Sequence, residues 1–316
     1  MIGRRLVFVG AAALASAPAT GQTPLKIGWL SIGEHPFISD FRQRMRGLGY
    51  VEGQNLLIEY RYANGNATLL PGLVDELVKA GVAMLVVSGS AATDAALAGA
   101  KGVPIVFVSS DPTISGSVAS LARPGGAATG ISTMSEDISP KKVGLLLDAV
   151  PKLARLAVLD DGSPGGSPQS ENMASAARRV GMEAKTFTLA DPSAFAAGFT
   201  DIALQGWQAA AAVSSPLFTA SARQVAELTV KHKLPAIFDT PAFVQAGALM
   251  SYGPDLKAVF RRQAEMVVRL GRGAKLADMP VEQATKFIFA FNQATARVCG
   301  LSLSMPVMAA VDELVE

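Results

Sequence analysis

Short apolar runs alternate with amphipathic segments along almost the whole chain from Lys26 onward. Parallel strands that are buried on both faces give such runs, and the segments between them have the spacing of helices. We therefore expect an α/β protein whose parallel sheets are covered by helices. The expected strands are 26–30, 56–60, 84–87, 105–108, 156–159, 183–188, 210–213 and 236–238. The expected helices are 37–48, 69–80, 91–100, 140–150, 170–180, 193–204, 219–232 and 255–270.

The alternation stops at residues 123–130 and then restarts, which indicates a second unit of the same kind. Residues 249–254 and 280–292 are expected to connect the two units again. The fold class that follows is α/β, with two doubly wound, Rossmann-like lobes joined by a multi-strand hinge. The first lobe is predicted to hold residues 22–130 plus 253–280, and the second lobe residues 131–252 plus 281–316. Ligands bind at the carboxyl ends of the strands in such sheets, so the cleft between the lobes is the expected site.

The first 21 residues have the composition of a secretory signal peptide. Arg4 and Arg5 precede an apolar run from residue 6 to residue 15, and small residues follow. As a helix, residues 6–17 would span about 18 Å, too short for a hydrocarbon core of about 30 Å. Cleavage is expected after Gly21, with Sec export as the default over a twin-arginine route. We therefore expect a periplasmic protein that does not span the membrane, although the segment could instead be a frayed extension.

Charge and cysteine content exclude several function classes. Without residues 1–21 the chain keeps 26 basic and 26 acidic residues and has no basic run, which argues against a nucleic-acid partner. Cys299 is the only cysteine, so no intramolecular disulfide and no cysteine-based metal site can form. No cofactor and no metal are expected. We expect a monomer.

Five segments carry a family resemblance that extends, in order, over essentially the whole mature chain. They are GLGYVEGQNLLIEYRYANG (47–65), SLARPGG (120–126), HKLPAIF (232–238), ALMSYGPDL (248–256) and MPVEQATKF (279–287). In these segments the chain resembles the ABC-transporter substrate-binding family with the type 1 periplasmic-binding fold. The resemblance implies delivery of a ligand to an ABC permease in the inner membrane. It also implies amino acids, often aromatic, or related small acids as ligands.

The sequence departs from the family pattern at several strand ends. Relatives usually have Asn-Val at residues 127–128 and often an Asn-Pro loop at 160–162, where this chain has Ala-Ala and Asp-Asp-Gly. A Gly-Thr-Pro-like turn is replaced by residues 88–91, and a short Gly/Ser loop by residues 32–36. Ligand contacts are expected at such positions. The sequence therefore leaves open a ligand other than the family's usual one.

In the first lobe, the strongest candidate for ligand contact is the segment that joins a buried strand to a helix start. The main-chain N–H groups of such a start can bind a carboxylate without a cation, although a serine there can simply cap the helix. Phe37 could stack on a ligand or belong to the core, His35 could be a solvated loop residue, and Asp111 could hold an ammonium or cap a helix. The candidates in this lobe are Ser31, His35, Phe37, Ser88, Gly89, Ser90, Ala91, Ser109 and Asp111.

In the second lobe, the candidates again follow expected strands. The two adjacent aspartates could hold an amine or hydroxyl groups, but Asp-Gly also favours turns. The candidates are Asp160, Asp161, Ser214, Pro216, Asp239 and Thr240.

The sequence argues against an enzyme. The chain has two histidines, no Gly-x-Ser-x-Gly motif, and neither a dinucleotide-binding motif nor a P-loop after a strand. The expected function is therefore the periplasmic solute-binding component of an ABC importer, with a small carboxylate-bearing ligand such as an amino acid. The alternatives are a sensory module that signals to a membrane receptor and an exported enzyme on the same scaffold.

Overall fold

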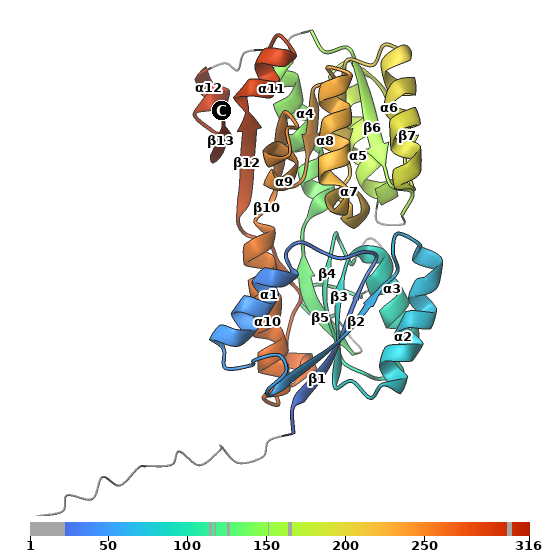
Figure 1. The fold of residues 1–316 in the computed structure, drawn as a ribbon, viewed down its shortest axis with the longest axis vertical. Coiled ribbons are helices and arrows are strands. Elements are labelled where there is room, and N and C mark those ends of the chain that lie inside the picture. Colours follow the sequence, from blue (N-terminus) through green and yellow to red (C-terminus); the bar gives the residue numbers. More distant parts are fainter. Residues whose placement is uncertain are drawn as a thin grey trace, which may run out of the picture.

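The computed structural model describes residues 23–113, 116, 118–124, 127–150, 152–163, 166–301 and 305–316. The expected signal peptide, residues 1–21, lies outside the described residues. The described part forms two α/β lobes, one above the other in Figure 1, each built around its own mostly parallel sheet. The predicted fold class is confirmed. No helix within these described ranges is long and apolar enough to cross a membrane.

The first lobe contains a six-stranded sheet in the order β11-β5-β4-β3-β1-β2. Its elements are β1 (Leu25–Ser31), α1 (Ile38–Gly47), β2 (Leu56–Tyr62), η1 (Ala67–Leu69), α2 (Leu70–Lys79), β3 (Met84–Ser88), α3 (Ser90–Gly99), β4 (Ile105–Ser109), β5 (Ala128–Ser132), α10 (Leu256–Gly271), η3 (Leu276–Asp278) and β11 (Glu282–Gln283). Helices α1 and α10 pack together, as do α2 and α3. Trp29 of β1 is fully buried and packs on Phe41 of α1 and Phe260 of α10, with ring centroids 5.2 and 6.1 Å away.

The second lobe contains a seven-stranded sheet in the order β13-β12-β10-β9-β8-β6-β7, in which only the β10–β12 pair is antiparallel. Its elements are α4 (Ser135–Ala149), β6 (Arg155–Asp160), α5 (Gly166–Arg179), β7 (Glu183–Thr188), η2 (Pro192–Ala194), α6 (Phe195–Leu204), β8 (Ala209–Ala212), α7 (Pro216–Ala220), α8 (Ala222–Lys231), β9 (Ala236–Phe238), α9 (Pro241–Gln245), β10 (Met250–Pro254), β12 (Phe287–Asn292), α11 (Gln293–Val298), α12 (Met305–Met308) and β13 (Glu313–Val315). Helices α4 and α5 pack together, and α8 packs against α6 and α9.

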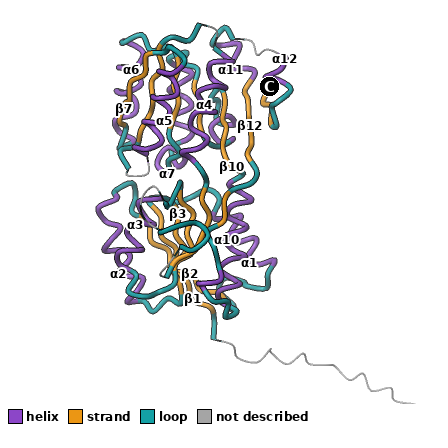
Figure 2. Tube along the Cα trace, turned by 180° about the vertical axis from the view of Figure 1, so that it is seen from behind, coloured by secondary structure: helices purple, strands orange, loops and turns teal. Residues whose placement is uncertain are grey.

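The chain passes between the two sheets three times, after β5, after β10 and after β11, and Figure 2 shows these connections from behind. Hydrogen bonds join the crossing segments to each other. Ala284 N donates to Ser132 O at 2.9 Å, and Asp255 N donates to Lys286 O at 2.9 Å. The Lys286 ammonium also lies 3.0 Å from Asp255 Oδ2. A three-stranded connection of this kind can act as a hinge.

The structure differs from the sequence prediction at the first crossing. The interruption at residues 123–130 was expected to be the crossing itself, but Ala128–Ser132 pairs in parallel with β4 as a further strand of the first sheet. Gly130 permits this pairing, because a side chain there would overlap Phe107. Likewise Glu282 and Gln283 pair with β5 and not with the second sheet. The predicted lobe limits themselves stay a prediction.

Several predicted helices also have different bounds, among them the helix predicted over 170–180, which begins at Gly166. The helix predicted from residue 140 begins at Ser135, with Pro140 inside it. A proline cannot donate to the carbonyl four residues earlier, and Asn172 Nδ2 donates to Glu136 O instead, at 3.4 Å. The helix predicted over 219–232 is divided at Ser221 into α7 and α8.

Candidate functional site

A cavity of about 310 Å³ lies between the lobes, where strands of both sheets end. In the described part of the chain its ionisable lining side chains are His35, Asp161 and Asp239, with no lysine or arginine. The first lobe contributes Ile32, His35, Gly65, Asn66, Ala67, Ser88, Gly89, Ser90, Ala91, Ala92, Val108, Ser109, Ser110, Leu256 and Phe260. The crossings and the second lobe contribute Thr133, Asp161, Gly162, Ser163, Ala190, Ser214, Ser215, Pro216, Leu217, Thr219, Asp239 and Pro254.

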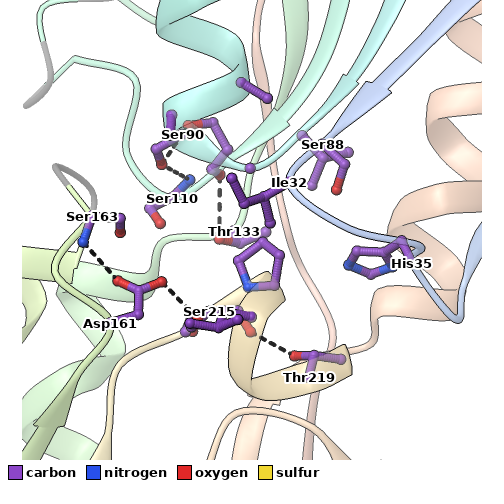
Figure 3. A pocket seen from close by; sticks show the side chains of 18 of the residues that line it. Ile32, His35, Ser88, Ser90, Ser110, Thr133, Asp161, Ser163, Ser215 and Thr219 are labelled. Carbon is purple, nitrogen blue, oxygen red and sulfur yellow. Dashed lines mark hydrogen bonds between the residues drawn. The ribbon is translucent and has the colours of Figure 1, made fainter. Parts of the chain in front are cut away.

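The first-lobe wall is centred on the start of α3. Gly89, which precedes the helix, has φ 96° and ψ 151°, a conformation that is essentially restricted to glycine. The Ser90 hydroxyl lies 3.0 Å from the Ser109 hydroxyl and accepts from Ser110 N at 3.3 Å (Figure 3). The first N–H groups of an α-helix have no acceptor within the helix, and they carry the positive end of its dipole. This wall can therefore bind an anionic group without a basic side chain.

The second-lobe wall is centred on Asp161 and the start of α7. Asp161 Oδ2 accepts from the Ser215 hydroxyl at 2.6 Å, and Asp161 Oδ1 accepts from Ser163 N at 3.0 Å (Figure 3). Ser215 in turn caps α7, because its side chain accepts from Phe218 N. These bonds fix the orientation of the Asp161 carboxylate at the edge of the cavity.

The rings of His35 and Phe260 belong to the cavity lining. The His35 ring lies 4.6 Å from the ring of Phe260 and 5.4 Å from that of Phe37, measured between centroids. Burial lowers the pKa of His35 to about 4, because a charged imidazolium would lose its hydration there. His35 is therefore neutral at physiological pH, and it extends an otherwise apolar surface.

Replacing His35 with phenylalanine should reduce the loss of stability in acid. The unfolded chain binds a proton at this residue at a higher pH than the folded chain does. Stability therefore falls as the pH drops from 6.5 towards 4, by about 3 kcal/mol from this group. Urea unfolding of both proteins at pH 7 and pH 4.5 measures the difference. Equal losses of stability in wild type and variant would contradict this account.

Direct contacts join the lobes beside the cavity. A Cβ atom added at Gly89 would lie 3.2 Å from Pro216 Cγ of the second lobe. The fully buried Gln169 of α5 donates to the Ser110 hydroxyl at 3.1 Å and accepts from Ser214 N at 2.8 Å. One side chain of the second lobe therefore links strand-end segments of both lobes.

The structure brings together most of the residues predicted from the sequence. Those that line the cavity are His35, Ser88, Gly89, Ser90, Ala91, Ser109, Asp161, Ser214, Pro216 and Asp239. Those that lie outside the lining are Ser31, Phe37, Asp111, Asp160 and Thr240. A role in ligand contact stays a prediction for all of them.

The candidates outside the lining have local partners. Ser31 is buried and donates to Gly33 O at 2.7 Å, and Phe37 packs on Phe260 with ring centroids 6.0 Å apart. Asp111 accepts from Thr113 N at 2.8 Å, and Asp160 accepts from Gly162 N at 2.6 Å. Thr240 caps α9. For Asp160 the bond is the turn that the sequence left open as an alternative, and for Phe37 the contact is the core packing that the sequence left open.

Some lining residues were absent from the predicted set. Asn66 lies after the carboxyl end of β2. The expectation that ligands bind at strand ends, which identified Ser88, could therefore have identified Asn66 as well. Ser110 and Ser215 adjoin predicted residues. Phe260 lies on α10, which reaches the first lobe only after the second crossing, and no local signal marks it.

Comparison with known proteins identifies the family. A family profile described as "ABC transporter substrate binding protein" matches residues 34–315. A "Tyrosine-binding protein" of Clostridioides difficile (strain R20291) is 22% identical over 278 residues, which cover 86% of this chain and 79% of that protein. Both results agree with the resemblance noted in the sequence.

Solved structures show the same fold. An ABC domain in complex with L-Trp from Streptococcus pneumonia has a TM-score of 0.81 at 21% identity, covering 92% of this chain and 100% of that one. A ligand-free, open substrate-binding protein from Clostridium difficile has a TM-score of 0.62 at 20% identity, covering 92% and 99%. The chain belongs to the ABC transporter substrate-binding protein family.

Proposed function

We propose that this protein is the exported solute-binding component of an ABC importer and that its ligand is an amino acid with an apolar or aromatic side chain. The observation that carries the proposal is that one cavity has a wall of hydrogen-bond donors on the first lobe and a wall of carboxylates on the second lobe. The start of α3 offers N–H groups to a carboxylate, and Asp161 and Asp239 of the second lobe offer acceptors to an ammonium. An amino acid carries both groups.

The remaining lining suits an uncharged side chain. Ile32, Leu217, Leu256 and Phe260 present apolar surface, beside the neutral ring of His35. Burial of such a side chain contributes about 25 cal/mol per Å². The two relatives named for tyrosine and L-Trp support this ligand class.

Closure of the two lobes around the ligand is part of the proposal. The Gln169 side chain already bonds to both lobes, and Gly89 of the first lobe lies close to Pro216 of the second. The structure is also more similar to the L-Trp complex than to the open, ligand-free protein, with TM-scores of 0.81 and 0.62. A ligand shifts the equilibrium only if it binds the closed state better. We infer that the monomeric protein then delivers its ligand to a permease in the inner membrane.

A panel of solutes tests the ligand class. L-tyrosine, L-tryptophan, L-phenylalanine and L-leucine are compared with ribose and glucose by thermal unfolding and calorimetric titration. An amino acid present at one hundred times its Kd should stabilise the folded state by about 2.7 kcal/mol and raise Tm by about 5 °C. Stabilisation by the sugars alone, or by none of the solutes, would contradict the proposal.

A further inference from the structure

One buried amide of the second lobe bonds to residues that line the cavity from both lobes. Gln169 lies in α5 and has no exposed surface. Its Oε1 atom accepts from Ser214 N, just after β8, at 2.8 Å, and its Nε2 atom donates to the Ser110 hydroxyl, just after β4, at 3.1 Å. Ser214 and Ser110 both belong to the lining, whereas Gln169 does not. The amide therefore lies behind the cavity wall and can act on a ligand through its partners.

The main-chain partner fixes which end of this amide faces which lobe. A main-chain N–H group can donate but not accept, so the atom that meets Ser214 N is the amide oxygen. The amide nitrogen then faces Ser110. Because an amide nitrogen also donates and does not accept, the Ser110 hydroxyl oxygen is the acceptor of this bond. The hydroxyl proton of Ser110 therefore points away from Gln169.

The main chain of Ser110 is held on the same wall as the start of α3. Its N–H group donates to Ser90 Oγ at 3.3 Å, and its carbonyl oxygen accepts from the Ser132 hydroxyl at 2.6 Å. Figure 3 shows Ser110 beside Ser90, with Asp161 on the other side of the cavity. Among the described residues, Gln169 is the hydrogen-bond partner of the Ser110 hydroxyl, so the hydroxyl proton remains available to a ligand. It would add a donor to those of the α3 start.

This arrangement depends on the position of the lobes, because Gln169 belongs to the second lobe and Ser110 to the first. In an open protein the Ser110 hydroxyl would bond to water, and its proton would have no fixed direction. A donor that is oriented before the ligand arrives loses less freedom on binding. A hydrogen bond to a carboxylate is also stronger than one to a neutral acceptor, so such a donor favours an acid over its amide.

We propose that Ser110 donates a hydrogen bond to the carboxylate of the ligand, and that Gln169 is the positioning residue that directs the Ser110 hydroxyl proton into the cavity when the lobes close. The inference rests on the proposed function. It adds that the site selects a free carboxylate over a carboxamide, and it assigns that selection to one hydroxyl group and the amide behind it.

The experiment compares L-tyrosine with L-tyrosinamide and L-tryptophan with L-tryptophanamide, which keep the amine and the side chain. Calorimetric titration of each protein gives its preference for the acid. The ionisation of the ligand amines is the same with every protein, so it cancels when a variant is compared with wild type. Ser110→Ala should reduce the preference about tenfold, because it removes a bond to a charged group. Gln169→Met should reduce it about threefold, because the hydroxyl can then rotate among three staggered positions.

The double variant and a matched control separate positioning from a general loss of packing. With both Ser110→Ala and Gln169→Met, the preference should equal that of Ser110→Ala alone, because Gln169 acts through Ser110. Gln263→Met is the control. Gln263 is also a fully buried glutamine, and its amide donates to Val87 O at 3.1 Å and Val106 O at 3.0 Å, but it lies outside the cavity lining. This variant should lose stability and keep the wild-type preference.

The outcomes distinguish the inference from the function on which it rests. An unchanged preference in Ser110→Ala, or a further threefold fall in the double variant, would overturn the inference and leave the proposed function intact. An equal fall in Gln263→Met and Gln169→Met would do the same. Wild type that binds neither amino acid, or that binds the amides as tightly as the acids, would overturn both. Circular dichroism establishes that each variant is folded. If Gln169→Met does not fold, Ser110→Ala still decides, because an unchanged preference there overturns the inference.

Discussion

Gly89→Ala should lower the affinity for the proposed amino-acid ligand at least tenfold. The backbone at Gly89 has a conformation that other residues adopt only at a cost of about 1 to 3 kcal/mol. The new methyl group would also lie 3.2 Å from Pro216 Cγ, so it would press the lobes apart in their present arrangement. Relief of that strain would move the start of α3 away from the carboxylate of the proposed ligand. Calorimetric titration with L-tyrosine or L-tryptophan measures the loss.

Gly81→Ala is the matched control. Gly81 has φ 68° and lies in the same lobe, but an added Cβ atom would have no neighbour within 4 Å. The variant should lose about 1 to 2 kcal/mol of stability through backbone strain and keep the wild-type affinity. An equal fall in affinity in both variants would mean that strain alone, and not the contact between the lobes, explains the effect.

Gly253→Ala should destabilise the fold by about 3 kcal/mol or more. Gly253 lies in β10, and a Cβ atom there would overlap the main-chain oxygen of Asp239 on the neighbouring segment. The main chain cannot rotate away as a side-chain tip can, so the end of β9 must move. Because Asp239 belongs to the cavity lining, the affinity for the proposed amino-acid ligand should fall as well. Urea unfolding and ligand titration give the two effects.

The opposite result is expected at Gly144, inside α4. A Cβ atom there would have no neighbour within 4 Å, and alanine is the better helix former. Gly144→Ala should therefore stabilise the fold by about 1 kcal/mol. A destabilising Gly144→Ala, or a neutral Gly253→Ala, would show that the packing around these glycines differs from the one described.

The fold was largely predictable because the signals for it are local. Strands such as Met84–Ser88 are buried along their whole length, and that burial requires an apolar run. The helix bounds were less predictable where distant groups intervene. Pro140 indicates a helix start when only its own neighbours are considered, yet Asn172 of α5 compensates the carbonyl that Pro140 leaves free. The strand Ala128–Ser132 was missed for a similar reason, since its pairing depends on how Gly130 meets Phe107.

The cavity was predictable only in part. The end of a parallel strand is a good local signal, and it led to Ser88–Ala91 and Ser214. Successive residues at a strand end point in different directions, so the rule could not choose between Asp160 and Asp161, and only Asp161 lines the cavity. Leu256 and Phe260 lie at the cavity because the chain returns to the first lobe after β10. No local sequence pattern indicates that return.

The repeated passage of the chain between lobes also has a consequence for the order of folding. Trp29 completes its packing only with Phe260, and the edge of the first sheet is formed by Glu282 and Gln283. During synthesis, an N-terminal fragment of about half the chain would therefore have α1 but not α10 over this face of β1. Both halves should reach their native packing almost together, once nearly the whole polypeptide has been made.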